Sequence, residues 1–244
     1  MGFLALLYGL ISYVLFLVAF LYAIGFTGNF LVPKGIDDGP AVALGTALVT
    51  NLILLSIFAV QHTIMARPGF KRWWTKIVPE SIERSTFVLL TNLIFFLIFW
   101  KWQPIAGDVW KVENAAGQAV LWGVFALGWL CVLVSSFLID HFDLFGLRQV
   151  WLRFRNREYT HPVFQETSLY RHIRHPLLLG FLIAFWATPH MTWGHFLFAA
   201  MTTAYTLVGI QFEERDLAVA HPEHYADYKG RVPMILPTGA KRAR

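Results

Sequence analysis

The sequence has little charge and almost no cysteine. Only 14% of its 244 residues are charged, 57% are hydrophobic and one is a cysteine. Soluble domains carry about 25% charged residues, so this shortage of charge predicts an integral membrane protein. The single cysteine, Cys131, excludes a disulfide framework and a metal site with several thiolate ligands. The sequence therefore predicts a membrane protein that folds without disulfides.

Four apolar runs are long enough to cross a bilayer, which takes about 20 helical residues. These runs cover residues 3–26, 41–65, 86–102 and 120–139. Because a segment in lipid must satisfy its own backbone hydrogen bonds, each run is predicted to be a helix.

Two shorter apolar runs follow a polar stretch, at residues 177–187 and 193–212. The first run alone would reach about 16 Å as a helix, roughly half of a bilayer core. It crosses only if the polar residues before it are already helical, so we expect a helical hairpin whose first arm begins near Ser168. The predicted fold class is all-α: a polytopic integral membrane protein with five to six transmembrane helices and a C-terminal helical hairpin.

Lysine and arginine lie mostly on one side of the predicted spans. All but Lys34, Lys101 and Lys111 lie in the loop at 66–85, in the segment 140–175 or in the C-terminal tail. By the positive-inside rule these parts and both termini face the cytoplasm. Anionic lipids explain the net charge of +5, so we expect membrane lipids as partners, no nucleic acid and no obligate protein partner.

Four ionisable side chains are crowded together just before the hairpin, in the stretch Tyr170-Arg171-His172-Ile173-Arg174-His175-Pro176. On a helix the three-residue spacing puts Arg171 beside Arg174 and His172 beside His175. Such a cationic face suits a ligand carboxylate, which arginine binds through two parallel hydrogen bonds. A basic belt that holds lipid head groups is the other interpretation. No nearby carboxylate or thiol completes a metal site around the histidines, so no metal is expected.

An acidic pair, Glu213 and Glu214, is predicted to end the last long helix. Negative charge is unfavourable there because of the helix dipole, so another interaction must compensate for it. One interpretation is a carboxylate that accepts hydrogen bonds from ribose hydroxyls or attracts a ligand cation. The other is a salt bridge to Arg171 or Arg174.

Asp140, His141 and Asp143 crowd the end of the fourth span. Ionisable residues at a membrane boundary are candidates for function, and a histidine beside a carboxylate can act as a general base. A helix end fixed by polar contacts is the alternative. Gln61 and His62 lie inside the second span, where a histidine is more often a satisfied core residue, although haem ligation needs only one or two such residues.

Several of these residues together resemble the C-terminal core of the isoprenylcysteine carboxyl methyltransferase family, integral membrane enzymes that use S-adenosylmethionine. The shared residues are Arg174-His175-Pro176, Gly180, Glu213-Glu214, Tyr225, Tyr228, Val232-Pro233 and Pro237. A fuller pattern is similar to the bacterial methanethiol S-methyltransferases, which make dimethyl sulfide from methanethiol. It consists of residues 58–62 (FAVQH), 83–86 (ERST), 141–149 (HFDLFGLRQ), 185–189 (FWATP) and 231–234 (RVPM).

The resemblance implies a thiol S-methyltransferase of a bacterial inner membrane, with S-adenosylmethionine as cofactor. We expect one membrane domain, in which residues 1–139 supply four helices and residues 140–244 form the catalytic core with a cytosolic cofactor-binding segment. Residues 141–149 would line the thiol end of the site, and Leu178 stands where the wider family commonly has tyrosine. The residues implied to surround the cofactor are Tyr170, His172, Arg174, His175, Leu179, Glu213, Glu214 and Tyr225.

The chemistry of a thiol substrate predicts further roles. An alkyl thiol with a pKa near ~8.5 is mostly protonated at neutral pH, so the enzyme needs a base or a cation to hold the thiolate. We expect His141 and Asp143 as catalytic base and orienting partner, and Arg148, Arg171 or Arg174 as the cation. Methanethiol offers little surface, so selectivity requires a small apolar pocket. The residues predicted to bind the substrate are Phe142, Phe145, Arg148, Gln149 and Trp186.

Three alternatives remain open at the level of sequence. The same cofactor site would also serve methylation of a larger, lipid-borne thiol or carboxylate. The Gln61-His62 element also resembles the family named for nitric-oxide reductase accessory proteins, which favours a haem-binding membrane isomerase or a protein related to nitrogen oxides. The third alternative is a lipid-binding membrane protein without enzymatic activity.

Overall fold

The computed structural model describes residues 2–160, 162 and 164–236. Four of the described helices are long and apolar enough to cross a membrane. They are α1 (Gly2–Gly28), α2 (Leu44–Ala66), α4 (Glu80–Lys101) and α5 (Ala115–Ile139). They match the four predicted spans, which confirms an all-α membrane fold; a count of five to six spans stays a prediction. Pro237 and the basic tail residues Lys241, Arg242 and Arg244 lie outside the described residues.

Contacts between residues group the chain into two compact units. Unit 1 comprises residues 1–111, 142–161 and 190–198, and unit 2 comprises residues 112–141, 162–189 and 199–244. The predicted grouping into residues 1–139 and 140–244 stays a prediction.

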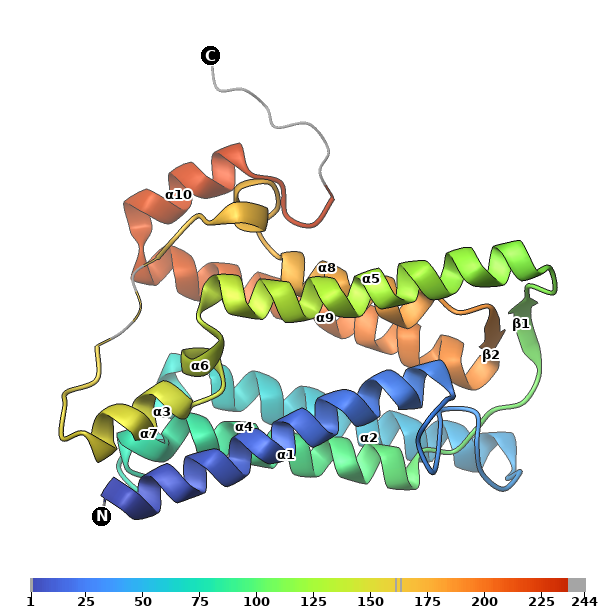
Figure 1. The fold of residues 1–244 in the computed structure, drawn as a ribbon, viewed down its shortest axis with the longest axis horizontal. Coiled ribbons are helices and arrows are strands. Elements are labelled where there is room, and N and C mark those ends of the chain that lie inside the picture. The colour runs from blue at the N-terminus through green and yellow to red at the C-terminus, as the bar shows by residue number, and fades with distance from the viewer. Residues whose placement is uncertain (1, 161, 163, 237–244) are drawn as a thin grey trace. The chain divides into compact units, whose positions relative to one another are not determined.

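Unit 1 is built on three of the long helices. α4 packs against α1 and α2, and the short helix α7 (Leu147–Phe154) packs against α1 (Figure 1). The short helix α3 (Pro68–Trp74) follows α2 and has proline at its first position, where the missing N–H costs no hydrogen bond. Many large apolar side chains of α1 are exposed, Leu21 to 65%, and this is the pattern of a helix that faces lipid.

The small antiparallel sheet of the described chain also belongs to unit 1. Strand β1 (Asp108–Lys111) pairs with β2 (His190–Thr192), so that Asp108 lies opposite Thr192 and Lys111 opposite His190. The pairing joins the connection after α4 to the start of α9 (Trp193–Ala220).

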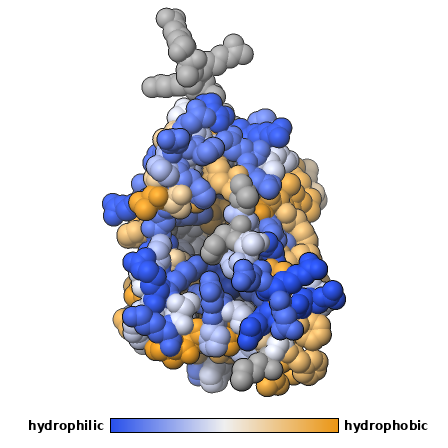
Figure 2. All heavy atoms as spheres, turned by 90° about the vertical axis from the view of Figure 1, so that its left-hand side faces the viewer, coloured by the Kyte–Doolittle hydropathy of each residue, from blue (hydrophilic) through white to orange (hydrophobic). Residues whose placement is uncertain are grey.

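Unit 2 is built on the close packing of α5 along α8 (Pro176–Trp186), the two helices that lie side by side in Figure 1. Glycines allow this approach: a Cβ atom on Gly128 would lie 2.7 Å from the backbone N of Ala184 and 2.9 Å from the carbonyl O of Gly180. Small residues at such contacts are typical of helices that associate in lipid. The unit also contains the turn η1 (Ser168–Arg171), most of α9, and α10 (Pro222–Arg231), over which hydrophilic residues gather in Figure 2.

The first arm of the hairpin begins at Pro176, not near Ser168 as the sequence predicted. Residues 168–171 form a single turn of 3₁₀-helix, and the N–H groups of Arg174 and His175 donate to the carbonyls of Pro233 and Met234 at 2.9 and 3.1 Å. These long-range bonds replace helical ones. The expected helical pairing of Arg171 with Arg174 and of His172 with His175 is therefore wrong.

The acidic pair also lies elsewhere than predicted. α9 continues to Ala220, so Glu213 and Glu214 lie within the helix and not at its C-terminal end. The unfavourable dipole interaction expected for them is absent from this position, because the helix dipole acts mainly within the last turn. Their role has to be inferred from what their carboxylates contact.

Candidate functional site

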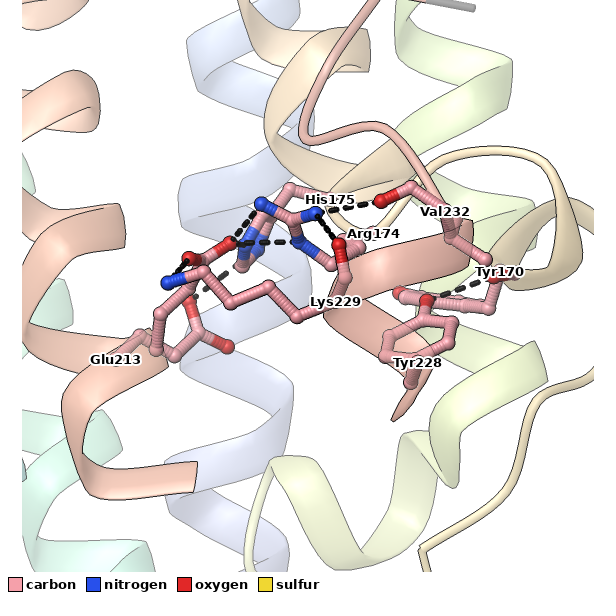
Figure 3. A network of polar contacts seen from close by, with 8 residues as sticks. Tyr170, Arg174, His175, Glu213, Tyr228, Lys229 and Val232 are labelled. Carbon is pink, nitrogen blue, oxygen red and sulfur yellow. Dashed lines mark hydrogen bonds and ion pairs between the residues drawn. The ribbon is translucent and has the colours of Figure 1, made fainter. Parts of the chain in front are cut away.

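The polar network of unit 2 is centred on the ion pair between Arg174 and Glu214. Nε and Nη2 of Arg174 both lie 2.7 Å from Oε1 of Glu214, and the two side chains are only 9% and 5% exposed. Nζ of Lys229 lies 2.9 Å from Oε2, and Nε2 of His175 lies 3.2 Å from Oε1. Figure 3 shows these side chains converging on one carboxylate. The protein itself thus fills the hydrogen-bonding capacity of Glu214.

The same arginine fixes the segment before α8 to the end of α10. Nη1 of Arg174 donates to the carbonyls of Val232 and, at 3.1 Å, of Lys229. Close by, the Tyr228 hydroxyl donates to the carbonyl of Tyr170 at 2.7 Å (Figure 3). Arg174 therefore connects the segment before α8 to α10 by hydrogen bonds. Of the two interpretations of Glu214, this geometry supports the salt bridge.

The electrostatics of this network keep Glu214 charged. Burial works to raise the pKa of Glu214, but hydrogen bonds from Lys229, Arg174 and His175 outweigh burial and hold the pKa below its ordinary value. Burial, reinforced by the negative charge of Glu166, raises the pKa of Tyr228 to about 12. The network at neutral pH therefore contains an anionic glutamate beside a protonated, hydrogen-bonding tyrosine.

Three predicted cofactor residues of unit 2 offer groups that this network does not use up. The Glu213 side chain is 53% exposed, and its Oε2 lies 3.6 Å from Nδ1 of His175. Tyr225 is 1% exposed, and its hydroxyl makes no hydrogen bond within the described part of the chain. His172 is exposed at the end of η1. These groups can act on a ligand: a carboxylate, a buried hydroxyl and an imidazole.

A second polar network lies in unit 1, around Asp143. Its Oδ1 accepts from Nη1 of Arg148 at 3.0 Å, and its Oδ2 accepts from the Tyr159 hydroxyl at 3.2 Å. Nε2 of Gln149 donates to the carbonyl of Asp143 at 3.2 Å. The motif at 141–149 thus folds into a compact turn whose polar side chains bind one another.

Side chains at the start of α4 donate hydrogen bonds to this turn. Nε of Arg84 donates to the carbonyl of Leu144 at 2.6 Å, and the Ser85 hydroxyl donates to the carbonyl of Gly146 at 3.3 Å. Gly146 has a φ of 87°, and a Cβ atom there would lie 2.7 Å from the backbone N of Ser85. The close approach requires glycine, and it brings the 83–86 motif into contact with the 141–149 motif.

The aromatic residues predicted for the thiol pocket are distributed over both units. In unit 1, the Phe145 ring stacks on Phe16 with centroids 3.7 Å apart, and the Phe142 ring lies 6.3 Å from Tyr13. In unit 2, Nε1 of Trp186 donates to the Thr203 hydroxyl at 2.9 Å. Their joint role in binding a thiol stays a prediction.

His141, the predicted base, belongs to unit 2. Its side chain is 3% exposed, its ring stacks on Phe137 with centroids 4.2 Å apart, and its Nδ1 lies 2.8 Å from Oγ of Ser136. Burial lowers the pKa of His141, and the charge of Asp140 partly opposes that effect. The imidazole is therefore neutral near pH 7, the form in which it can accept a proton. Its pairing with Asp143, which belongs to unit 1, stays a prediction.

His62 lies in α2 among aromatic rings of unit 1. Its ring centroid is 5.2 Å from that of Phe58 and 4.8 Å from that of Phe87. Its Nδ1 is buried without a hydrogen bond in the part of the chain that the structure describes. The aromatic contacts are those of a core histidine.

Several known proteins similar to this chain over nearly its whole length carry the same name. Methanethiol S-methyltransferase of Mycobacterium tuberculosis is 54% identical over 235 residues, which cover 96% of each chain. Methanethiol S-methyltransferase 2 of Bradyrhizobium diazoefficiens is 53% identical over 239 residues, covering 98% of this chain and 92% of the relative. The chain belongs to the methanethiol S-methyltransferase family. This confirms the family that the sequence motifs indicated.

More distant similarity extends beyond that family. Nurim of Mus musculus is 25% identical over 181 residues, which cover 70% of this chain and 68% of the relative. No family model matches the chain, and no solved structure matches it. The site of this methanethiol S-methyltransferase family member therefore has to be argued from its own geometry.

Sequence reasoning missed three residues that contact the candidate residues. Lys229 completes the shell of Glu214, Arg84 supports the Asp143 turn, and Ser136 contacts His141. Arg84 carried a signal, because it lies in the 83–86 motif that the resemblance singled out. Lys229 and Ser136 carried none: one is a lysine on a polar helix, and the other a small residue within an apolar run.

Proposed function

We propose that this protein transfers a methyl group from S-adenosylmethionine to methanethiol and so forms dimethyl sulfide. The observation that carries the proposal is 54% identity over 96% of both chains to a protein named for this substrate and this transfer. Conservation of function is the usual expectation when nearly the whole chain aligns. The geometry of unit 2 gives the proposal a physical basis.

The open groups of unit 2 fit S-adenosylmethionine by their chemistry. The ligand has a positive sulfonium, ribose hydroxyls and an aromatic base. An exposed carboxylate such as Glu213 attracts the positive charge and accepts hydroxyl hydrogen bonds. The Tyr225 hydroxyl makes no hydrogen bond of ordinary length in the described chain, and burial together with the nearby Glu214 raises its pKa, so the hydroxyl stays protonated and can donate to a ligand. Tyr170 and Leu179, both partly buried, can add contact area.

Arg174, His175 and Glu214 serve this site by shaping it. Their mutual bonds fix the segment before α8, on which Tyr170 and His172 lie, to α9 and α10. Rigid placement of binding groups is what a transfer reaction needs, because in-line alignment of the reacting atoms supplies a large part of the rate. We include these three residues in the cofactor site as its frame.

When bound, S-adenosylmethionine supplies an electrophilic methyl group on a sulfonium. The charges of a thiolate and a sulfonium both disappear as the methyl moves, so a poorly solvating site favours the reaction over water. His141 is buried and neutral, and we assign to it the removal of the thiol proton. The residues proposed to bind the thiol remain Phe142, Phe145, Arg148, Gln149 and Trp186.

We also propose that the site faces the cytoplasm of a bacterium and that the protein lies in its inner membrane. The basic residues of α3, α7 and α10 flank the candidate spans, as the positive-inside rule expects for cytoplasmic segments. The cytoplasm is also where a nucleotide-derived cofactor is available.

The test is the detection of dimethyl sulfide in the headspace over purified protein. The detergent-solubilised protein receives methanethiol and S-adenosylmethionine, and control samples lack one of the two. Product that requires both substrates supports the proposal. A panel of longer alkyl thiols tests selectivity, and equal rates with long-chain thiols would favour a lipid-borne substrate. A haem absorption band with no product would move attention to His62 and count against the proposed function.

A further inference from the structure

The backbone has an unusual conformation at the end of α5, directly before His141. Asp140, which follows α5, has φ 145° and ψ 84°, a conformation that residues other than glycine rarely adopt. Unusual backbone geometry of this kind persists where the surrounding structure requires it. Here it brings the His141 ring against Phe137, with planes 5° apart, and brings Nδ1 to 2.8 Å from the Ser136 hydroxyl oxygen.

The Ser136 hydroxyl also contacts a backbone carbonyl, and this contact bears on the direction of the hydrogen bond between Ser136 and His141. Its Oγ donates to the carbonyl of Leu133 at 2.7 Å. A serine hydroxyl has one proton and can donate it only once. Both contacts of Oγ are hydrogen bonds at once only if its proton goes to the carbonyl and Oγ accepts from His141, so that Nδ1 carries the hydrogen. In a neutral imidazole the lone pair then lies on Nε2.

We propose that Ser136 is a positioning residue, which holds His141 as the Nδ1–H tautomer and so makes Nε2 the acceptor of the thiol proton. The inference rests on the proposed function and deepens it. It assigns to a buried serine the orienting role that the sequence assigned to Asp143. Buried serine is suited to the task, since burial of the pair excludes water that would compete for Nδ1.

The proton and electron balance of the step is complete. The S–H bond of the thiol breaks, its proton moves to Nε2 of His141, and the electron pair stays on sulfur. That sulfur bonds to the transferred methyl carbon, whose bond to the donor sulfur breaks and leaves the electron pair there. The products are dimethyl sulfide, a neutral thioether from the donor, and a proton, which the imidazolium returns to water.

The surroundings of His141 in unit 2 place this end of α5 beside the proposed cofactor site. The Tyr170 hydroxyl donates to the carbonyl of Ser135 at 3.4 Å, and the Thr167 hydroxyl donates to the carbonyl of Leu138 at 3.1 Å. Neither side chain is charged at neutral pH. Among the described residues, Asp140 is a charged neighbour whose carboxylate favours the imidazolium after proton transfer.

The first test reads the tautomer directly, without activity. Protein with ¹⁵N-labelled imidazoles gives long-range proton–nitrogen correlations that distinguish Nδ1–H from Nε2–H, and His141→Gln identifies the signal among the nine histidines. We expect Nδ1–H in the wild type, loss of that preference in Ser136→Ala, and its return in Ser136→Thr, which keeps a hydroxyl. Nε2–H in the wild type, or an unchanged tautomer in Ser136→Ala, would overturn the proposal.

The second test reads the pH dependence of turnover. Ser136→Ala should lower kcat/KM for methanethiol by roughly 10- to 100-fold at neutral pH, which is less than complete loss of general-base assistance, worth roughly 100- to 10,000-fold, because His141 itself remains. The deficit should shrink at high pH, where the thiol ionises unaided, while the KM for S-adenosylmethionine stays unchanged. A deficit that is equal at all pH values would indicate a structural effect and count against the positioning role.

The matched control is Ser135→Ala, one residue away on the same helix. Ser135 is as deeply buried as Ser136, and the group that Tyr170 contacts is its backbone carbonyl, which alanine retains. We expect this variant to keep the wild-type tautomer and pH profile. If the wild type makes no dimethyl sulfide but the tautomer shifts as described, the proposed function has failed and the assignment of Ser136 stands.

Discussion

The two polar networks of the molecule are built from similar parts but differ in how completely they are closed. In unit 2 the carboxylate of Glu214 is 5% exposed and its arginine partner, Arg174, is 9% exposed. In unit 1 the corresponding values are 15% for Asp143 and 29% for Arg148. The unit 2 pair is thus shielded from water, whereas the unit 1 pair is partly hydrated.

Hydrogen bonding separates the networks further. Glu214 is contacted by the side chains of Arg174, Lys229 and His175, and Arg174 also binds two carbonyls. Near the Asp143 turn, Oε1 of Glu83 and Oε1 of Gln149 are buried without a hydrogen bond in the described chain, as is the Tyr225 hydroxyl in unit 2. Buried acceptors without donors are unusual and indicate places where a ligand or water supplies one. We therefore propose that the Glu214 network stabilises the fold and that ligands contact groups outside it.

The largest expected effect comes from breaking the closed network. Glu214→Ala should destabilise the protein by roughly 3–5 kcal/mol, because it leaves Arg174 buried without its counter-charge. Thermal unfolding in detergent measures the loss. Glu213→Ala is the control, since its side chain is 53% exposed, and a change below about 1 kcal/mol is expected there. Equal losses of stability in the two variants would contradict the claim that Glu214, and not Glu213, stabilises the fold.

A smaller effect is expected from the turn of unit 1. Gly146→Ala should cost roughly 1–3 kcal/mol, because alanine is strained at a φ of 87° and its Cβ would lie 2.7 Å from the backbone N of Ser85. Gly45→Ala in α2 is the control, since nothing lies within 4 Å of the added Cβ. Denaturation of both variants gives the comparison, and a tolerated Gly146→Ala would show that the turn is looser than described.

Acid should act selectively on the closed network. The pKa of Glu214 is lower in the folded protein than in the unfolded chain, so its contribution is fully present above the ordinary glutamate pKa of about 4.3. It is lost as the pH falls through the folded value, by at most ~1.4 kcal/mol per pH unit. Unfolding measured from pH 6 downward should show a steeper decline for the wild type than for Glu214→Gln. Parallel curves would mean that Glu214 is not held as an anion.

The smallest effect is expected at the partly exposed pair. Asp143→Asn should cost about 0.5–1 kcal/mol, since the Arg148 side chain is 29% exposed and water can replace part of the lost interaction. It should also lower the pKa of Tyr159, which burial and the charge of Asp143 raise to about 12. Tyrosinate absorbance during an alkaline titration reports that change. An unshifted titration would show that Asp143 does not act on Tyr159.

Hydropathy and sequence motifs correctly predicted those features of the protein that depend on local composition. The four spans followed from run length, and the family followed from motifs such as the 141–149 segment. What the sequence could not give depends on distant partners. The hairpin begins at Pro176 because Arg174 and His175 donate their N–H groups to Pro233 and Met234, some sixty residues away. No local pattern encodes that exchange.

The same limit explains the site. Glu213 and Glu214 are identical in type and adjacent in sequence, and only the fold shows that one is 53% and the other 5% exposed. The tie between Ser136 and His141 depends on the backbone of Asp140, whose φ of 145° no side-chain pattern predicts. The residue types indicated the candidates. Their tertiary contacts distinguish the side chains that bind one another from those that we propose to bind a ligand.

The most direct test of this division is the affinity of Glu213→Gln for S-adenosylmethionine, measured by titration calorimetry on folded protein in detergent. The account predicts binding about tenfold weaker than wild type, or roughly 1.4 kcal/mol, because the exposed carboxylate faces the cationic cofactor. The affinity for S-adenosylhomocysteine, which lacks the sulfonium charge, should fall less in Glu213→Gln. The control variant Glu223→Gln, on the exposed side of α10, should leave the affinities for both ligands unchanged. Unchanged affinity of Glu213→Gln for S-adenosylmethionine would contradict the account.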